Sequence, residues 1–255
     1  MADATVSVSA VIRERRGVCV TRERTPQMLD RAPVTQTIAR RLQDMIRTGE
    51  LRTGEKIPSQ RILSQRLKVS RPSLREALLT LETLGLVRTL PARGTFVIDR
   101  DAEAEPQNVW RYDDAFSIRD VFQSRMLIEP ELCRLAAGHI GAADLDSLER
   151  AAATFEDAWK QGDLVAHVEA DLRFHRTIAD ASPNKMLRRL YRSVQNLLTE
   201  SQRQPIPNTA RERMTQSMQE HREIMLALRE GDGRRAEAAM CKHIRNTAAC
   251  AGVNL

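Results

Sequence analysis

The spacing of apolar residues in the first third of the chain predicts three successive helices. From Val34 onwards apolar residues recur every three or four positions, as they do on one face of a helix, and Gly49 follows where a helix C-cap is expected. Ser59 and Ser70 each precede a further apolar repeat, so that their side chains can cap two more helices. Gly85 ends the last of these.

Two short β-prone runs come next, at residues 86–90 and 95–98. They flank Pro91-Ala92-Arg93-Gly94, a sequence typical of a turn, and therefore predict a β-hairpin. Three helices followed by a hairpin form a winged helix-turn-helix, which we place at residues 33–98.

The rest of the chain has a mostly helical pattern. Residues 99–114 are acidic and weakly patterned, as a linker is, whereas residues 115–250 contain six helical segments. The segments are separated by breaks near Gly141, Gly162, Pro183, Pro205 to Pro207 and Gly231 to Gly233. We therefore expect a mainly α protein whose second domain is an antiparallel bundle of six to seven helices. Residues 1–32 show no sustained period and are interpreted as a flexible arm or as the result of a misassigned start codon.

The net charge of +6 is concentrated in one part of the chain. Residues 33–100 carry thirteen Lys and Arg against six acidic residues, whereas residues 101–255 carry 21 against 24. A compact basic segment beside a slightly acidic one indicates that only the first binds a polyanion such as DNA. The low content of aromatic residues and glycine argues against a β-sandwich or an enzyme built on a large sheet.

No segment approaches the roughly 18 consecutive apolar residues that a membrane-spanning helix needs, and the N-terminus lacks the apolar core of a signal peptide. The cysteines show no C-x-x-C spacing. We therefore expect a cytoplasmic protein that binds no membrane and whose thiols are reduced and mostly buried. The four thiols are those of Cys19, Cys133, Cys241 and Cys250.

Four motifs stay in register over residues 34–98. They are Pro58-Ser59-Gln60-Arg61, Val69-Ser70-Arg71-Pro72-Ser73-Leu74-Arg75-Glu76-Ala77-Leu78, Leu84-Gly85-Leu86-Val87 and Arg93-Gly94-Thr95-Phe96-Val97. Together they resemble the signature of the GntR family of transcription regulators. The second domain, with Asp171-Leu172-Arg173-Phe174-His175 and later His221 and His243, resembles the helical FCD effector domain of the FadR subgroup.

The start of the third predicted helix carries side chains of the types that contact DNA. A helix fits the major groove, and residues at its N-terminal end face the base edges. Ser70, Arg71, Ser73 and Arg75 occupy that end. Because an arginine can form two hydrogen bonds with guanine, we expect Arg71 or Arg75 to read a base and the serines to contact phosphates.

Three further residues complete the predicted DNA surface. Arg93 and Gly94 at the hairpin tip would reach the minor groove or the backbone, and the family resemblance adds Arg61 on the second helix. The alternative is that these arginines form only a solvated face. Since one such domain reads few base pairs, we expect a homodimer on a palindromic operator.

The second domain contains a candidate metal site. Asp171 and His175 lie four residues apart, so that on a helix their side chains can share one cation, although this spacing is also common on helix surfaces. In the subgroup that the chain resembles, one Asp and three His from three helices hold a divalent metal, and His221 and His243 match that pattern. Carboxylate and imidazole suit Zn, and also Ni, Mn or Fe. His167 is not marked by the resemblance and is expected to be solvated or at the edge of the core.

Four protein ligands around an octahedral ion leave two positions that an organic acid can fill. The resemblance implies that Arg125 lines the ligand cavity, where its guanidinium would pair with a carboxylate. The subgroup's usual acidic residue two positions earlier is Gln123 here, which alters the pocket chemistry. Arg125 could instead form a structural salt bridge with Glu129, four residues on.

The sequence therefore predicts a transcription regulator, expected to be a repressor, whose affinity for double-stranded DNA changes when a small organic or sugar acid binds at the metal centre. One alternative is a metal-dependent enzyme, which is disfavoured because no general base stands at a recognisable spacing. Another is a regulator whose metal is structural or is itself the signal. A fatty-acyl effector is disfavoured because the metal centre would occupy the polar heart of the cavity.

Overall fold

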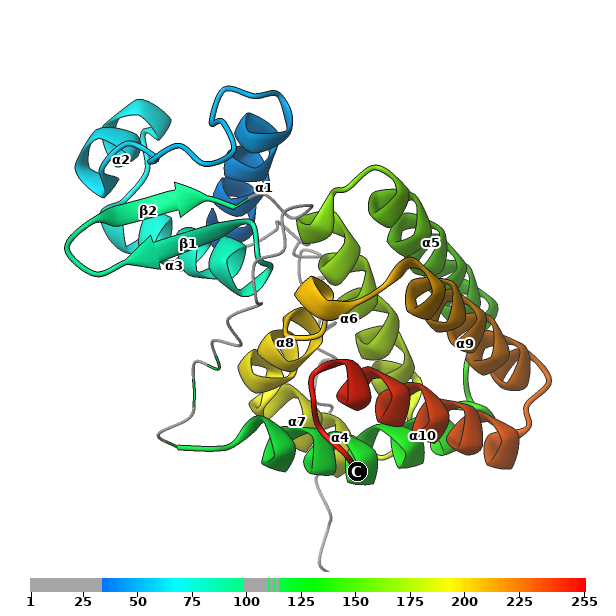
Figure 1. Ribbon diagram of the computed structural model, residues 1–255. Helices are drawn as coiled ribbons and strands as arrows, with labels where there is room; N and C mark the ends of the chain where they lie inside the picture. The colour runs from blue at the N-terminus through cyan, green and yellow to red at the C-terminus, as the bar shows by residue number, and fades with distance from the viewer. Residues whose placement is uncertain (1–33, 99–109, 111, 113–114) are drawn as a thin grey trace, which may run out of the picture. The chain divides into compact units, whose positions relative to one another are not determined.

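The computed structural model describes residues 34–98, 110, 112 and 115–255. The predicted arm, residues 1–32, and nearly all of the predicted linker, residues 99–114, lie outside the described residues. Figure 1 labels the helices and strands of the described part. They are α1 (Val34–Arg47), α2 (Gln60–Leu67), α3 (Arg71–Thr83), β1 (Val87–Leu90), β2 (Gly94–Val97), α4 (Ile118–Ala136), α5 (Ala142–Lys160), α6 (Leu164–Ala181), α7 (Lys185–Ser193), α8 (Gln195–Arg203), η1 (Ile206–Asn208, a 3₁₀-helix), α9 (Arg211–Arg229) and α10 (Gly233–Cys250).

Serine caps begin two of the three N-terminal helices, as the sequence predicts. The Ser59 hydroxyl accepts a hydrogen bond of 3.5 Å from the amide of Ile62 at the start of α2, and Ser70 accepts one of 3.2 Å from the amide of Ser73 at the start of α3. Lys68, with a left-handed φ of 54°, ends α2 and turns the chain into α3. The apolar faces of the helices form one core, whose fully buried leucines are Leu42, Leu63, Leu74, Leu81 and Leu84.

The predicted wing is present as an antiparallel hairpin of β1 and β2. Its register pairs Val87 with Val97 and Leu90 with Gly94. Gly94 adopts a φ of +111°, a conformation that L side chains rarely adopt, and the turn depends on glycine at this position. Strand β1 packs against α3, which fixes the wing beside the third helix.

The second domain consists of α4 to α10. Helices α5 and α6 pack along each other as an antiparallel pair joined at residues 161–163, and α9 and α10 do the same across residues 230–232. Helix α4 packs against α10, so that the first and last helices of this domain lie side by side (Figure 1). The core side chains exposed by no more than 1% include Phe122, Cys133, Leu148, Phe174, Ile224 and Ile244. The mainly α fold is thereby confirmed.

The described residues 115–255 contain seven α-helices, one more than the six segments counted from the sequence. The additional break lies at Val194, between α7 and α8, where the backbone leaves the helical conformation with φ −108° and ψ 15°. Buried Tyr191 and Leu198 on either side of this break pack into one cluster with Leu132. Tertiary packing therefore sets this break, which no glycine or proline marks in the sequence.

The structure describes three of the four cysteines. Cys133, Cys241 and Cys250 are free thiols, and burial raises the pKa of the Cys133 thiol above its ordinary value. Cys19 lies outside the described residues. Among the described helices, none combines the length and the apolar character needed to cross a membrane.

Candidate nucleic-acid interface and metal centre

The N-terminal end of α3 presents an exposed basic surface. Arg71 and Arg75 lie one helical turn apart on the same face, and both are exposed. Arg61 on α2 and Arg93 in the hairpin turn are exposed as well. None of these four arginines forms an ion pair with another residue in the described ranges, so their charges are available to an anion.

The two serines at the start of α3 are linked to each other. The hydroxyl oxygens of Ser70 and Ser73 lie 2.7 Å apart, and Ser70 also caps the helix. Gly94, at the end of the hairpin turn, lies against the flexible end of the Lys56 side chain, which an added β-carbon would displace. The structure thus places the predicted DNA residues at the start of α3, on α2 and on the wing, and their contact with DNA stays a prediction.

The four predicted metal ligands come together from three helices. Asp171 and His175 lie on α6, His221 on α9 and His243 on α10. Each offers one ligand atom, and all four atoms lie within 4.8 Å of one another. Asp171 Oδ1 is 3.2 Å from Nε2 of His221 and 3.7 Å from Nε2 of His175.

Three of the four residues in this cluster carry buried polar atoms without a hydrogen-bond partner in the described part of the chain. Asp171 Oδ1, His175 Nε2 and both ring nitrogens of His221 are buried and make no hydrogen bond there. Burying polar atoms without partners costs free energy. Atoms bound about 2.0–2.2 Å from a Zn ion lie roughly 3–4 Å apart, close to the separations found between Asp171 and the two imidazoles. The residues therefore fit a divalent metal ion.

The protonation states also suit a metal. Burial by itself raises the pKa of Asp171. The neighbouring His175 and His221 lower this pKa by more than burial raises it, so the pKa lies below its ordinary value. Burial lowers the pKa of His243 to about 4, although its hydrogen bond to Glu220 acts in the opposite direction. An ionised carboxylate and a neutral imidazole are the forms that bind metals.

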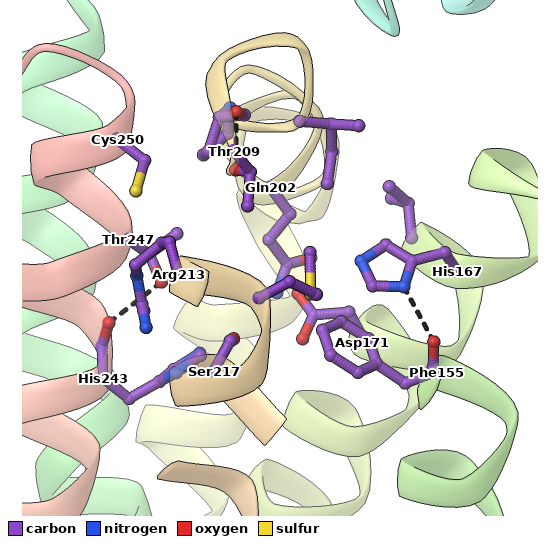
Figure 2. A pocket seen from close by; sticks show the side chains of 14 residues that line it. Phe155, His167, Asp171, Gln202, Thr209, Arg213, Ser217, His243, Thr247 and Cys250 are labelled. Atoms are coloured by element: carbon purple, nitrogen blue, oxygen red, sulfur yellow. Dashed lines mark hydrogen bonds between the residues drawn. The ribbon is translucent and has the colours of Figure 1, made fainter. Parts of the chain in front are cut away.

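A cavity adjoins the cluster and is lined by Asp171 and His243 (Figure 2). Figure 2 shows Arg213 on the same side as His243 and His167 on the opposite side. The other polar lining side chains are Gln202, Thr209, Ser217 and Thr247. Gln202 is buried, and its Oε1 has no hydrogen-bond partner among the described residues. The cavity therefore presents polar side chains beside the candidate metal ligands.

His167 belongs to the cavity wall. The expectation that this histidine is solvated is therefore wrong. Its side chain is buried, and its Nδ1 donates a hydrogen bond of 2.8 Å to the carbonyl oxygen of Phe155. Because Nδ1 carries the hydrogen, Nε2 of the neutral ring is left as an acceptor at the cavity.

Arg125 is fully buried on α4. Its Nε donates to Oε1 of Glu129 at 2.8 Å, and its Nη1 donates to the hydroxyl of Ser201 at 3.3 Å. The salt bridge that the sequence left open as an alternative is therefore present. Arg125 is not among the residues that line the cavity, although its Nη2 has no hydrogen-bond partner in the described chain. Its contact with an effector stays a prediction.

Sequence reasoning missed several residues around the candidate ligands. Glu220 accepts a hydrogen bond of 2.9 Å from Nδ1 of His243 and pairs with Arg213 at 2.8 Å. It directly precedes His221, but neighbouring residues on a helix project in different directions, so this proximity does not reveal that Glu220 contacts His243. Gln202 reaches the cavity from a helix whose sequence carries no recognisable signal of ligand binding.

Two family profiles match the chain in sequence. The profile described as "Bacterial regulatory proteins, gntR family" matches residues 34–97. The profile described as "FCD domain" matches residues 120–246, which contain all four candidate metal ligands.

Individual relatives agree with these profiles. The "HTH-type transcriptional regulator LutR" of Bacillus subtilis (strain 168) is 32% identical over 207 residues, which cover 79% of this chain and 94% of the relative. The "Galactonate operon transcriptional repressor" of Escherichia coli (strain K12) is 29% identical over 186 residues, which cover 67% of this chain and 76% of the relative. A solved structure described as a putative transcriptional regulator GntR from Rhodococcus sp. RHA1 has a TM-score of 0.50 and 24% identity, covers 87% of this chain and 99% of that chain, and supports the fold.

Proposed function

Because the chain belongs to the GntR family of bacterial transcription regulators and carries the FCD effector domain, we propose that it is a repressor whose affinity for operator DNA changes when a small carboxylate binds at a metal centre. Proteins of this family are DNA-binding regulators and not enzymes, so a metal-dependent enzyme is set aside. The observation that carries the proposal is the cluster of buried, unpartnered donor atoms beside a polar cavity.

The first domain would bind DNA through the N-terminal end of α3. Arg71 and Arg75 project from one face of the helix and are not engaged in ion pairs with described residues, so either can fork onto a guanine in the major groove. Ser70 and Ser73 would contact phosphate at the positive end of the helix. Arg61 and the wing residues Arg93 and Gly94 are in this proposal additional backbone or minor-groove contacts.

The second domain would hold one divalent metal ion through Asp171, His175, His221 and His243. Mixed carboxylate and imidazole ligands favour Zn, and Ni, Mn or Fe also suit them. When bound, such an ion supplies a positive charge that attracts a carboxylate oxygen of the effector. Asp171 and His243 belong both to this cluster and to the cavity wall, so an effector in the cavity lies beside the metal ligands.

The effector would be a small organic or sugar acid. Arg213 lines the cavity while its guanidinium is paired with Glu220, and Gln202, Ser217 and Nε2 of His167 offer partners for hydroxyl groups. The relative from Escherichia coli is by its name a repressor of the galactonate operon, and galactonate is a sugar acid. Arg125 is proposed as a further contact through its unpartnered Nη2.

The protein would act as a homodimer on a palindromic operator. One winged helix-turn-helix reads only a few base pairs, so two copies related by a two-fold axis are needed for useful specificity. Sedimentation of the protein with and without its DNA tests this directly, since a monomer in both conditions contradicts it.

The proposal is tested by thermal unfolding of chelator-treated protein with Zn, Ni or Mn, each with and without a panel of small hydroxy and sugar acids that includes galactonate. A ligand at about a hundred times its dissociation constant stabilises the fold by roughly 2.7 kcal/mol. We expect one class of acid to stabilise the protein only when metal is present. Stabilisation by metal alone would make the metal structural or the signal itself, and no response to any metal would contradict the metal centre.

The regulatory step needs a second measurement. DNA selected by the protein from a random pool serves as the operator, and its affinity is measured with and without the stabilising acid. Coupling between two sites commonly changes affinity by about 5- to 150-fold. An operator affinity that is the same at saturating acid would contradict the switch while leaving the binding site intact.

A further inference from the structure

His175 is held in place by polar groups of α4. Its Nδ1 lies 2.6 Å from Oε2 of Glu129, whose other carboxylate oxygen accepts a hydrogen bond of 2.8 Å from Nε of Arg125. Arg125 is itself fixed by the hydroxyl of Ser201 on α8. The side chains of Arg125, Glu129 and His175 are at most 4% exposed, so water does not compete for these bonds.

His243 is held in the same way from α9. Its Nδ1 lies 2.9 Å from Oε2 of Glu220. Two nitrogens of Arg213 donate to the same carboxylate at 2.8 and 3.1 Å, and Nδ2 of Asn246 donates to it at 2.7 Å. The Glu220 side chain is 3% exposed. The glutamate is therefore fixed on three sides, and its position fixes the imidazole.

These contacts determine which ring nitrogen can face a metal ion. An ionised carboxylate only accepts hydrogen bonds, so Nδ1 of His175 and of His243 carries the hydrogen. The lone pair of each neutral ring then lies on Nε2. In His175 this atom is buried without a hydrogen-bond partner among the described residues and points to Asp171, 3.7 Å away.

His221 lacks such a support. Neither of its ring nitrogens forms a hydrogen bond within the described chain, and the ring stacks on Phe174 with 4.3 Å between the ring centroids. The His221 ring also contacts the ring of Phe155, with 4.8 Å between the two ring centroids. No glutamate supports Nδ1 of this third histidine, so the glutamate supports are specific to the other two.

We propose that Glu129 and Glu220 are positioning residues of the metal centre, which fix His175 and His243 in the tautomer and orientation that present Nε2 to the ion. The inference rests on the metal centre proposed above. Carboxylates that orient a metal-binding imidazole also increase its basicity, and their loss commonly lowers metal affinity by about 10- to 100-fold. Arg125 and Arg213 act one step further out, by holding the two glutamates.

The test compares E129Q and E220Q with two matched controls. Glu131 on α4 and Glu223 on α9 are also ion-paired, with Arg134 and Lys242, but neither contacts a histidine of the cluster. The dissociation constant for Zn is measured by chelator competition, and the visible spectrum of bound Co²⁺ reports the ligand set. We expect E129Q and E220Q to weaken Zn binding by about 10- to 100-fold and to alter the Co²⁺ spectrum. We expect E131Q and E223Q to match the wild type in both.

Double variants separate positioning from a purely structural role. E129Q leaves the buried guanidinium of Arg125 without its partner, and E220Q does the same to Arg213, which can destabilise the fold. R125M/E129Q and R213M/E220Q remove both members of each ion pair, a change that buried pairs often tolerate. We expect these double variants to regain much of the stability of the chelator-treated protein while Zn binding stays weak.

The outcomes distinguish the two proposals. Wild-type protein that binds no Zn would contradict the metal centre itself. Wild-type protein that binds Zn, with E129Q and E220Q binding it equally tightly, would overturn the positioning role alone. A return of Zn affinity together with stability in the double variants would also overturn it, because the glutamates would then serve only the fold.

Discussion

Nδ1 of His167 donates a hydrogen bond of 2.8 Å to the carbonyl oxygen of Phe155, and the imidazole stacks on the Phe155 ring with 3.9 Å between the centroids. Burial lowers the pKa of His167 to about 4, although this hydrogen bond acts in the opposite direction. Between about pH 6.5 and pH 4 the unfolded chain therefore binds a proton that the folded protein does not. The free energy of unfolding falls as the pH falls through this window.

We expect H167N to reduce that pH dependence. Asparagine can place a donor near the former Nδ1 but does not ionise, so the fall in unfolding free energy between pH 6.5 and 4.5 becomes smaller by on the order of 2–3 kcal/mol. Urea unfolding of chelator-treated protein at several pH values measures the effect. The window ends at pH 4.5 because Glu129 and Glu220, whose pKa values are lowered to about 2, lose their contribution below it. H139N, at an exposed histidine, is the control, and an equal slope in H167N and the wild type would contradict the prediction.

The wing turn depends on Gly94. An alanine there would have to adopt a φ of +111°, which is strained for an L side chain, and it would also displace the flexible end of Lys56, so we expect G94A to cost about 1–2 kcal/mol and to weaken DNA binding. Gly138 is a matched control because its backbone is ordinary and no atom lies within 4 Å of an added β-carbon. Calorimetry and DNA titration of both variants measure the effects. Equal behaviour of G94A and G138A would show that the turn adapts.

Arg71 is the arginine nearest the start of α3 that is proposed to read a base. We expect R71A to lose about 1–3 kcal/mol of binding free energy for the selected operator and to accept other bases at one position. Arg52 serves as the control, since it is an exposed arginine of the same domain that lies 3.9 Å from Glu55. A uniform loss on all DNA sequences would assign Arg71 to a phosphate, and a loss equal to that of R52A would contradict both roles.

The fold of the N-terminal domain could be predicted because its signals are local. Ser59 and Ser70 cap helices through amides only three residues away, and Gly94 marks a turn between two adjacent strands. The break at Val194 could not be predicted, because the backbone there follows the packing of Tyr191 and Leu198 against another helix.

The candidate metal site could likewise be predicted only in part from the sequence. Asp171 and His175 share one helix face, so their spacing is visible in the sequence, and the family resemblance supplied His221 and His243. The contact between Glu129 and His175 spans 46 residues and depends on how α4 packs against α6. No periodicity within one helix can reveal such a pair.

His221 offers the sharpest test of the metal centre, because its imidazole makes no hydrogen bond within the described chain. H221F keeps an aromatic ring to stack on Phe174 and removes only the ligand atom, so we expect chelator-treated H221F to stay folded. The rise in the thermal midpoint that Zn gives the wild type is expected to vanish, while H139F, altered at an exposed histidine outside the cluster, retains it. Calorimetry of the three proteins at equal Zn concentration makes the comparison. If H221F kept the full Zn-dependent rise, His221 would not be a ligand, and the four-residue metal centre would have to be abandoned.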